Sequence, residues 1–157
     1  MEIESKHIQR LYIAYFARPA DPSGIKYWLD NASKGYQLQD ISKSFACQPE
    51  YKKLITSQES IDLQINQFYI NLFGRRADFE TINFWISMID KGTHNINDFI
   101  CDLICSFDKS FIIDSKELIN DLLTLENKVD AADLFTQEVS SNIIWINLYK
   151  PESLDPW

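Results

Sequence analysis

The stretch FGRRADFETINFWISMIDKG (residues 73–92) repeats a pattern that the chain already carries in FARPADPSGIKYWLDNASKG (residues 16–35). Both stretches place F, R, AD, W and KG in the same register, at an offset of 57 positions. Identical pairs extend the match on the N-terminal side: Ile8 with Ile65, Tyr12 with Tyr69, and Ile13 with Ile70. A fixed offset held over many positions is typical of an internal repeat. The sequence therefore predicts a duplicated structural unit.

Each copy begins with an apolar stripe that predicts a helix. Apolar residues recur at spacings of three and four, from Ile8 to Phe16 and again from Ile65 to Phe73. This spacing places them on one face of a helix. A third helix of each copy is expected over 39–47 and 97–106.

The middle helix of each copy has predicted start and stop signals. Asp21 and Asp78 stand at the N-cap position, where a carboxylate accepts a backbone N–H group. Gly35 and Gly92 stand at the end, where glycine adopts the left-handed cap conformation at little cost.

The C-terminal third continues in a helical pattern and then changes. Apolar residues within 111–139 are Leu118, Ile119, Leu122, Leu123, Val129, Ala132, Leu134 and Phe135. Residues 143–149 are nearly all apolar, and Pro151 and Pro156 then oppose a regular helix. We expect this apolar segment to pack on the repeats.

No low-complexity linker separates the copies, so we expect an all-α fold in which two tandem helical repeats form one compact body with additional C-terminal helices. The expected divisions are a first repeat (1–57), a second repeat (58–110), closing helices (111–140), and an apolar segment with a proline-containing tail (141–157).

The aromatic residues support two interpretations. Trp28 and Trp85 lie beside Ile and Leu at helical spacing, which predicts equivalent buried positions. If exposed, aromatic residues could instead stack on sugars or dock a partner; the candidate binding residues are Tyr12, Tyr27, Trp28, Tyr69, Trp85 and Trp157.

The composition excludes several classes of function. Hydrophobic residues make up 45% of the chain, enough for a packed core, and the net charge is −8. An acidic protein with scattered lysines and arginines is repelled by nucleic acids and anionic membranes. The charged start MEIESKHIQRLY argues against a cleavable signal peptide, and no segment predicts membrane insertion. The expected location is therefore the cytoplasm or a site reached by signal-peptide-independent export.

The motifs that could carry chemistry have simpler structural interpretations. Arg18 and Arg75 precede the capping aspartates by three residues; each could receive an anion, but a clamp on the turn is favoured because both copies need one. Three cysteines are an odd set, typical of a reducing compartment.

Catalytic and metal-binding motifs are missing from the sequence. Cys101 and Cys105 share a helix face, yet a zinc site needs further ligands that His94 alone does not supply. The segment at Asp21 lacks the alternating oxygen ligands of a calcium loop. The sequence predicts no catalytic residue, no metal centre and no cofactor.

Together these motifs resemble a bacterial family of domains of unknown function, family 4214, whose pattern is approximately LYxxxFGRxPDxxGxxYWxxxLxxG. The resemblance covers about residues 8–139. Ala17 replaces the usual glycine, Ala20 the proline, and Thr81 the glycine of the second copy. The stretch NKVDAADLFT (residues 127–136) resembles the closing helix of the family.

The resemblance implies a helical fold remotely similar to the linker domains of phycobilisomes. Such domains are commonly appended to secreted or surface proteins, some exported by type I systems, and no catalytic residues are assigned to them. We therefore expect a non-catalytic binding or scaffolding module whose partner is a protein or a surface glycan. The alternatives are a carbohydrate-binding module and a small acidic inhibitor or immunity-type protein that binds a basic partner.

Overall fold

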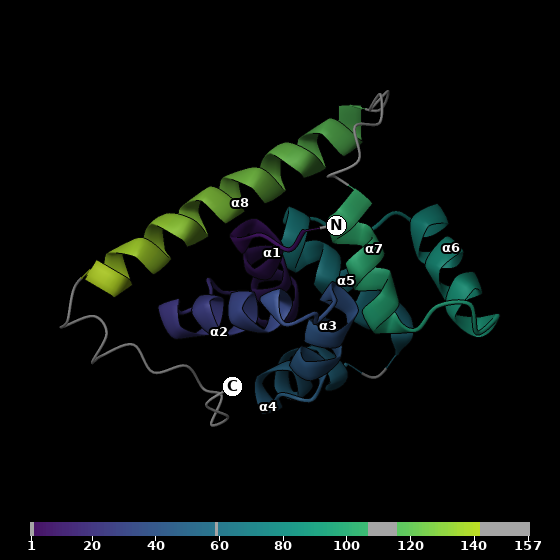
Figure 1. The fold of residues 1–157 in the computed structure, drawn as a ribbon. Coiled ribbons are helices and arrows are strands. Elements are labelled where there is room, and N and C mark those ends of the chain that lie inside the picture. Colours follow the sequence, from purple (N-terminus) through teal and green to yellow (C-terminus); the bar gives the residue numbers. More distant parts are fainter. Residues whose placement is uncertain (1, 59, 107–115, 142–157) are drawn as a thin grey trace.

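The computed structural model describes residues 2–58, 60–106 and 116–141, and this part of the chain is all-α, without a strand (Figure 1). The all-α prediction is therefore confirmed. The elements are α1 (Ser5–Phe16), α2 (Pro22–Ser33), α3 (Leu38–Ala46), α4 (Pro49–Tyr51), the π-helical segment η1 (Lys52–Thr56), α5 (Ile61–Phe73), α6 (Phe79–Asp90), α7 (Ile96–Ser106) and α8 (Lys116–Ser141).

The first helix, α1, lies at the centre of the molecule. Every residue from His7 to Phe16 is buried, because α2, α5, α7 and α8 all pack against α1. The sequence predicts a single apolar stripe on this helix, whereas its polar side is buried as well. That burial is possible because the polar side chains find partners: the Gln9 amide donates to Asp133 and Thr136 of α8 at 3.0 and 2.9 Å.

The two predicted copies pack against each other as one body. Helix α1 packs on α5 and α3 packs on α7, so like elements meet across the interface. Helices α3 and α7 begin one residue before the predicted starts, and α3 ends one residue before its predicted end. The fused compact body is confirmed, while the duplication remains a prediction from the sequence.

The last described element, α8, crosses the body as one long helix (Figure 1). It packs on α1, α2 and α5 through Asp121, Leu125, Val129, Ala132 and Val139. The closing segment was predicted as more than one helix, and within the described residues it is a single one. Residues 142–157, which include the predicted apolar segment and Trp157, lie outside the described residues.

The apolar pattern predicted for α8 is only partly buried. Leu118, Ile119, Leu123 and Leu134 are exposed. The buried positions 121, 125, 129, 132 and 139 follow helical spacing along one face. Ile119, Leu123 and Leu134 fall off that face, whereas Leu118 lies on it in the first turn of α8.

The two tryptophans of the repeat do not occupy equivalent environments. Trp28 is 3% exposed and packs edge-on against Phe45, with 5.4 Å between ring centroids. The ring centroids of Trp85 and Phe99 are 4.6 Å apart, but Trp85 is only partly buried. The prediction that both are fully buried is therefore wrong for Trp85. The two middle helices also differ in their cover, since α8 packs on α2 and not to a comparable extent on α6.

Candidate docking face

Most of the aromatic residues proposed for binding are in the core. Tyr12, Trp28 and Tyr69 are buried, and burial raises the pKa of Tyr69 to about 12. These three side chains offer no ring face to a sugar, so the predicted aromatic platform is not assembled. Tyr27 on α2 is exposed and Trp85 on α6 is partly so, while Trp157 lies outside the described residues.

Both arginines of the repeated motif bind internal carboxylates. Arg18 donates to the two carboxylate oxygens of Glu50 at 2.7 and 2.9 Å. Arg75 donates in the same manner to Asp121 at 2.7 and 2.6 Å. Each guanidinium also donates to the carbonyl of the next residue, Pro19 or Arg76. A guanidinium engaged in this way clamps its turn and is not available as a receptor for an external anion.

The predicted caps have the expected geometry. Asp21 accepts the backbone N–H of Gly24 at 2.7 Å, and Asp78 accepts that of Thr81 at 2.8 Å. The hydrogen bond from the Thr81 backbone is the main reason that the pKa of Asp78 is lowered. Gly35 and Gly92, which follow the ends of α2 and α6, have φ of +102° and +69°. These four residues have a structural role in starting and ending the helices.

The cysteines and His94 do not form a centre for chemistry. Cys101 is buried, and desolvation raises its pKa to about 12, so its thiol is protonated and a weak nucleophile. The His94 ring contacts the Asp102 carboxylate at 2.9 Å and not a cysteine. Within residues 2–58, 60–106 and 116–141, no three His, Cys, Asp or Glu side chains are grouped to hold a metal ion.

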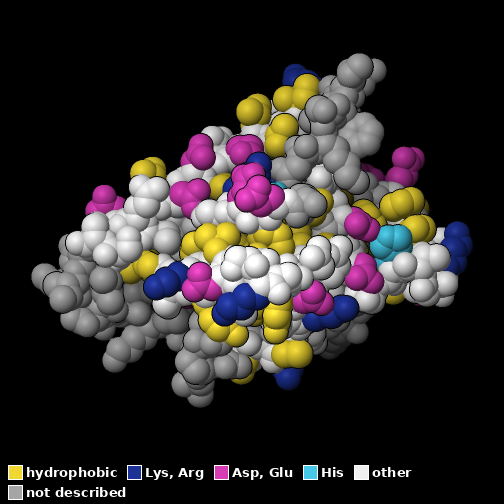
Figure 2. Space-filling model, in the orientation of Figure 1, with side chains coloured by type: hydrophobic (Ala, Val, Ile, Leu, Met, Phe, Trp, Pro, Cys, Tyr) yellow, Lys and Arg dark blue, Asp and Glu magenta, His cyan; other side chains and the backbone are white. Residues whose placement is uncertain are grey.

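The most unusual surface of the described chain is α6. Its residues include Phe79, Ile82, Phe84, Trp85 and Ile86, yet none is fully buried. Phe79 and Phe84 are 78% and 54% exposed. Figure 2 shows hydrophobic side chains gathered over this helix, at the right of the view. An amphipathic helix normally buries its apolar stripe. We call the apolar surface that α6 leaves exposed, formed mainly by Phe79 and Phe84, the α6 face.

The surroundings of the α6 face are acidic. Glu80 and Asp90 lie on α6, and Asp98 and Asp102 lie on α7. Neither helix contains a lysine or an arginine, although Arg76 precedes α6 and Lys91 follows it directly. Asp102 also contacts the His94 ring. None of the repeated motifs points to this face. A signal was present, because Phe79 and Phe84 stand where the first copy has Pro22 and Tyr27, and so make α6 more apolar than α2.

No protein-family model matches the chain, and no match is found among curated proteins or solved structures. The resemblance to family 4214 therefore remains a prediction from the motif. In the described part of the chain, no helix combines the length and the apolar character needed to cross a membrane.

Proposed function

We propose that the chain is a non-catalytic helical binding or scaffolding module that docks a protein partner on the α6 face. The observation that carries this proposal is that α6 contains several large apolar residues and none of them is fully buried. Phe79 and Phe84 are largely exposed to solvent. Phe79 and Phe84 are five residues apart, so the exposed apolar surface extends around α6 rather than along one stripe. Exposed apolar surface of this kind can mark an interaction site. By resemblance to family 4214, such a module belongs to a surface-associated or secreted bacterial system.

The charges around the α6 face indicate what kind of partner fits. The four carboxylates on α6 and α7 and the net charge of −8 favour a protein segment that combines apolar and basic side chains. Complementary charge would also accelerate association with such a partner. The same acidity opposes a nucleic acid.

A protein partner fits the face better than a sugar does. Phenylalanine side chains have no polar group with which to orient hydroxyls, and the aromatic residues predicted to stack on a glycan are mostly in the core. Among the candidates that the structure describes, Tyr27 and Trp85 reach the surface, and they lie on different helices.

The proposal is tested with two helical peptides of equal length, one built from leucine and lysine and one from leucine and glutamate. We expect saturable binding of the basic peptide by calorimetry. The variant Phe79→Gln/Phe84→Gln should weaken that binding about tenfold or more, since large apolar anchors dominate protein interfaces. Both positions are exposed, so the fold should be retained.

The matched control is Leu134→Gln, because Leu134 is 63% exposed but lies on α8. If this control weakens binding as much as the α6 variant, the attraction is nonspecific and the proposal is wrong. A sedimentation experiment on the protein alone completes the test: a dimer that only the α6 variant abolishes would identify the partner as a second copy.

A further inference from the structure

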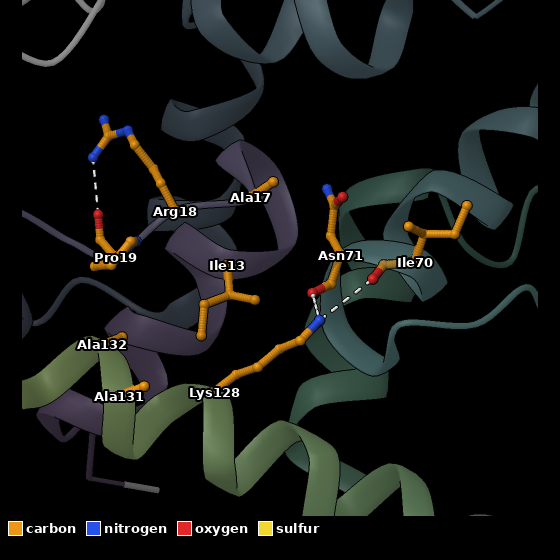
Figure 3. Close-up of a pocket in the computed structure, with 9 residues that line it drawn as sticks. All are labelled: Ile13, Ala17, Arg18, Pro19, Ile70, Asn71, Lys128, Ala131 and Ala132. Atoms are coloured by element: carbon orange, nitrogen blue, oxygen red, sulfur yellow. Dashed lines mark hydrogen bonds between the residues drawn. The ribbon is translucent and has the colours of Figure 1, made fainter.

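A separate cavity of about 460 Å³ lies where α1, α5 and α8 meet (Figure 3). Ile13, Pro19, Ile70, Ala131 and Ala132 supply most of its apolar wall. Ala131 and Ala132 give the α8 side of the wall two small side chains, of which Ala132 is buried and Ala131 is exposed. The volume is in the range of small-molecule sites.

One charged group in this cavity has no ionic partner. Lys128 reaches from α8 to the end of α5, where its ammonium donates to the carbonyls of Asn71 at 2.6 Å and Ile70 at 3.4 Å (Figure 3). No carboxylate among the described residues pairs with it. An ammonium has three N–H donors, so one remains after these two bonds. Desolvation by burial lowers the pKa of Lys128, which is the expected effect when a cation lacks a counter-charge.

The other polar side chains of the wall are already engaged. The Asn71 amide donates to the carbonyl of Ala14 at 2.8 Å and accepts from Gln67 at 2.9 Å. Arg18 is on the opposite side of the cavity from Lys128 and binds Glu50 (Figure 3). The cavity therefore combines an apolar wall with a single cationic end.

We propose that this cavity binds an aliphatic monocarboxylate of medium chain length. The carboxylate accepts a charge-assisted hydrogen bond from Lys128, and the hydrocarbon chain lies along Ile13, Pro19 and Ala131. A sugar would need several hydrogen-bonding groups, and a phosphate more than one cation. Neither requirement is met by a wall whose other polar groups are engaged internally.

The test uses decanoate and decanol, which share an alkyl chain and differ in charge. We expect wild-type protein to bind decanoate saturably by calorimetry, and decanol about tenfold or more weakly, as one charge-assisted hydrogen bond is lost. Lys128→Met should reduce the affinity for decanoate by a similar factor and leave that for decanol unchanged. Ala131→Leu fills the cavity and should abolish binding of both.

The matched control is Asn127→Leu, which places the same side chain at another exposed position of α8 outside the cavity. It should bind both ligands as wild type does. The proposal is overturned if wild-type protein binds the two ligands equally or neither saturably, or if Ala131→Leu still binds decanoate. The comparison of ligands on wild-type protein holds even if Lys128→Met weakens the fold by removing its bonds to the end of α5.

Discussion

Two aspartates begin helices with the same hydrogen bond in different surroundings. Asp21 is buried at the start of α2 and also accepts from the hydroxyl of Ser23. Asp78 is exposed at the start of α6 and accepts both the backbone N–H and the hydroxyl of Thr81. A cap is a local device, since donor and acceptor lie three residues apart. This is why a short sequence motif was enough to predict both.

The cap at Asp78 should make stability depend on pH. Its pKa is lowered from an ordinary value of 3.8 by the hydrogen bonds from Thr81, so the charged form stabilises the fold above that value. The stabilisation is lost as the pH falls through the depressed pKa of the folded state. We expect Asp78→Ala to destabilise the protein by about 1 kcal/mol at pH 7, and the difference from wild type to shrink below about pH 4. Denaturant titrations at pH 7 and pH 3 measure this difference. A constant difference would show that ionisation of Asp78 is not involved.

At the scale of elements, two arginines connect turns to distant helices. Arg18 joins the α1–α2 turn to Glu50 of α4, and Arg75 joins the α5–α6 turn to Asp121 of α8. Asp121 is buried, whereas about a third of the Arg75 side chain is exposed. The hydrogen bond to Asp121 raises the pKa of Arg75.

Removal of the Arg75 side chain should therefore destabilise the fold more than removal of an exposed charge. Arg75→Met leaves the buried carboxylate of Asp121 without its bidentate partner. We expect the free energy of unfolding to fall by about 2–3 kcal/mol. This is less than for a fully buried ion pair, because Arg75 is partly solvated. The control Arg76→Met, one residue away and exposed, should change stability by less than about 0.5 kcal/mol. Asp121→Asn in the Arg75→Met background should recover part of the loss. Equal melting of the two arginine variants would contradict this account.

The helices could be predicted from the sequence because their signals are local. Which faces of these helices are buried by other helices could not be predicted. The middle helices of the two copies share an aspartate cap, a tryptophan and a terminal glycine, and both form where the pattern predicts. The burial of Trp28 and the partial burial of Trp85 depend on tertiary packing, and the pattern of α8 gives no indication of which middle helix it will cover. The substitution of Pro22 and Tyr27 by Phe79 and Phe84 in the second copy was a local signal for the α6 face, but it does not show that these side chains stay exposed.

At the scale of the whole molecule, α8 and α7 supply partners that allow the polar side of α1 to be buried. Gln9 bonds to Asp133 and Thr136, and Arg10 bonds to Glu126 at 2.6 Å and to the carbonyl of Ile104 at 3.0 Å. These partners lie more than 90 residues away along the chain. No periodicity within α1 could reveal them, which explains why the apolar stripe alone did not predict the burial of the polar side of α1.

A chain that ends at residue 106 should therefore lose cooperative folding. It would expose the α8-facing sides of α1, α2 and α5 and would leave Gln9 and Arg10 without their α8 partners. Short helices depend on tertiary burial for stability, and the smaller fragment 1–57 should be less structured still. Circular dichroism during heating measures this: the full chain should melt in one sharp transition and fragment 1–106 in a broad one at lower temperature. Adding a separate peptide of residues 107–157 should restore the sharp transition. If 1–106 alone melts as sharply and as high as the full chain, α8 is an accessory helix and the two copies form a complete core without it.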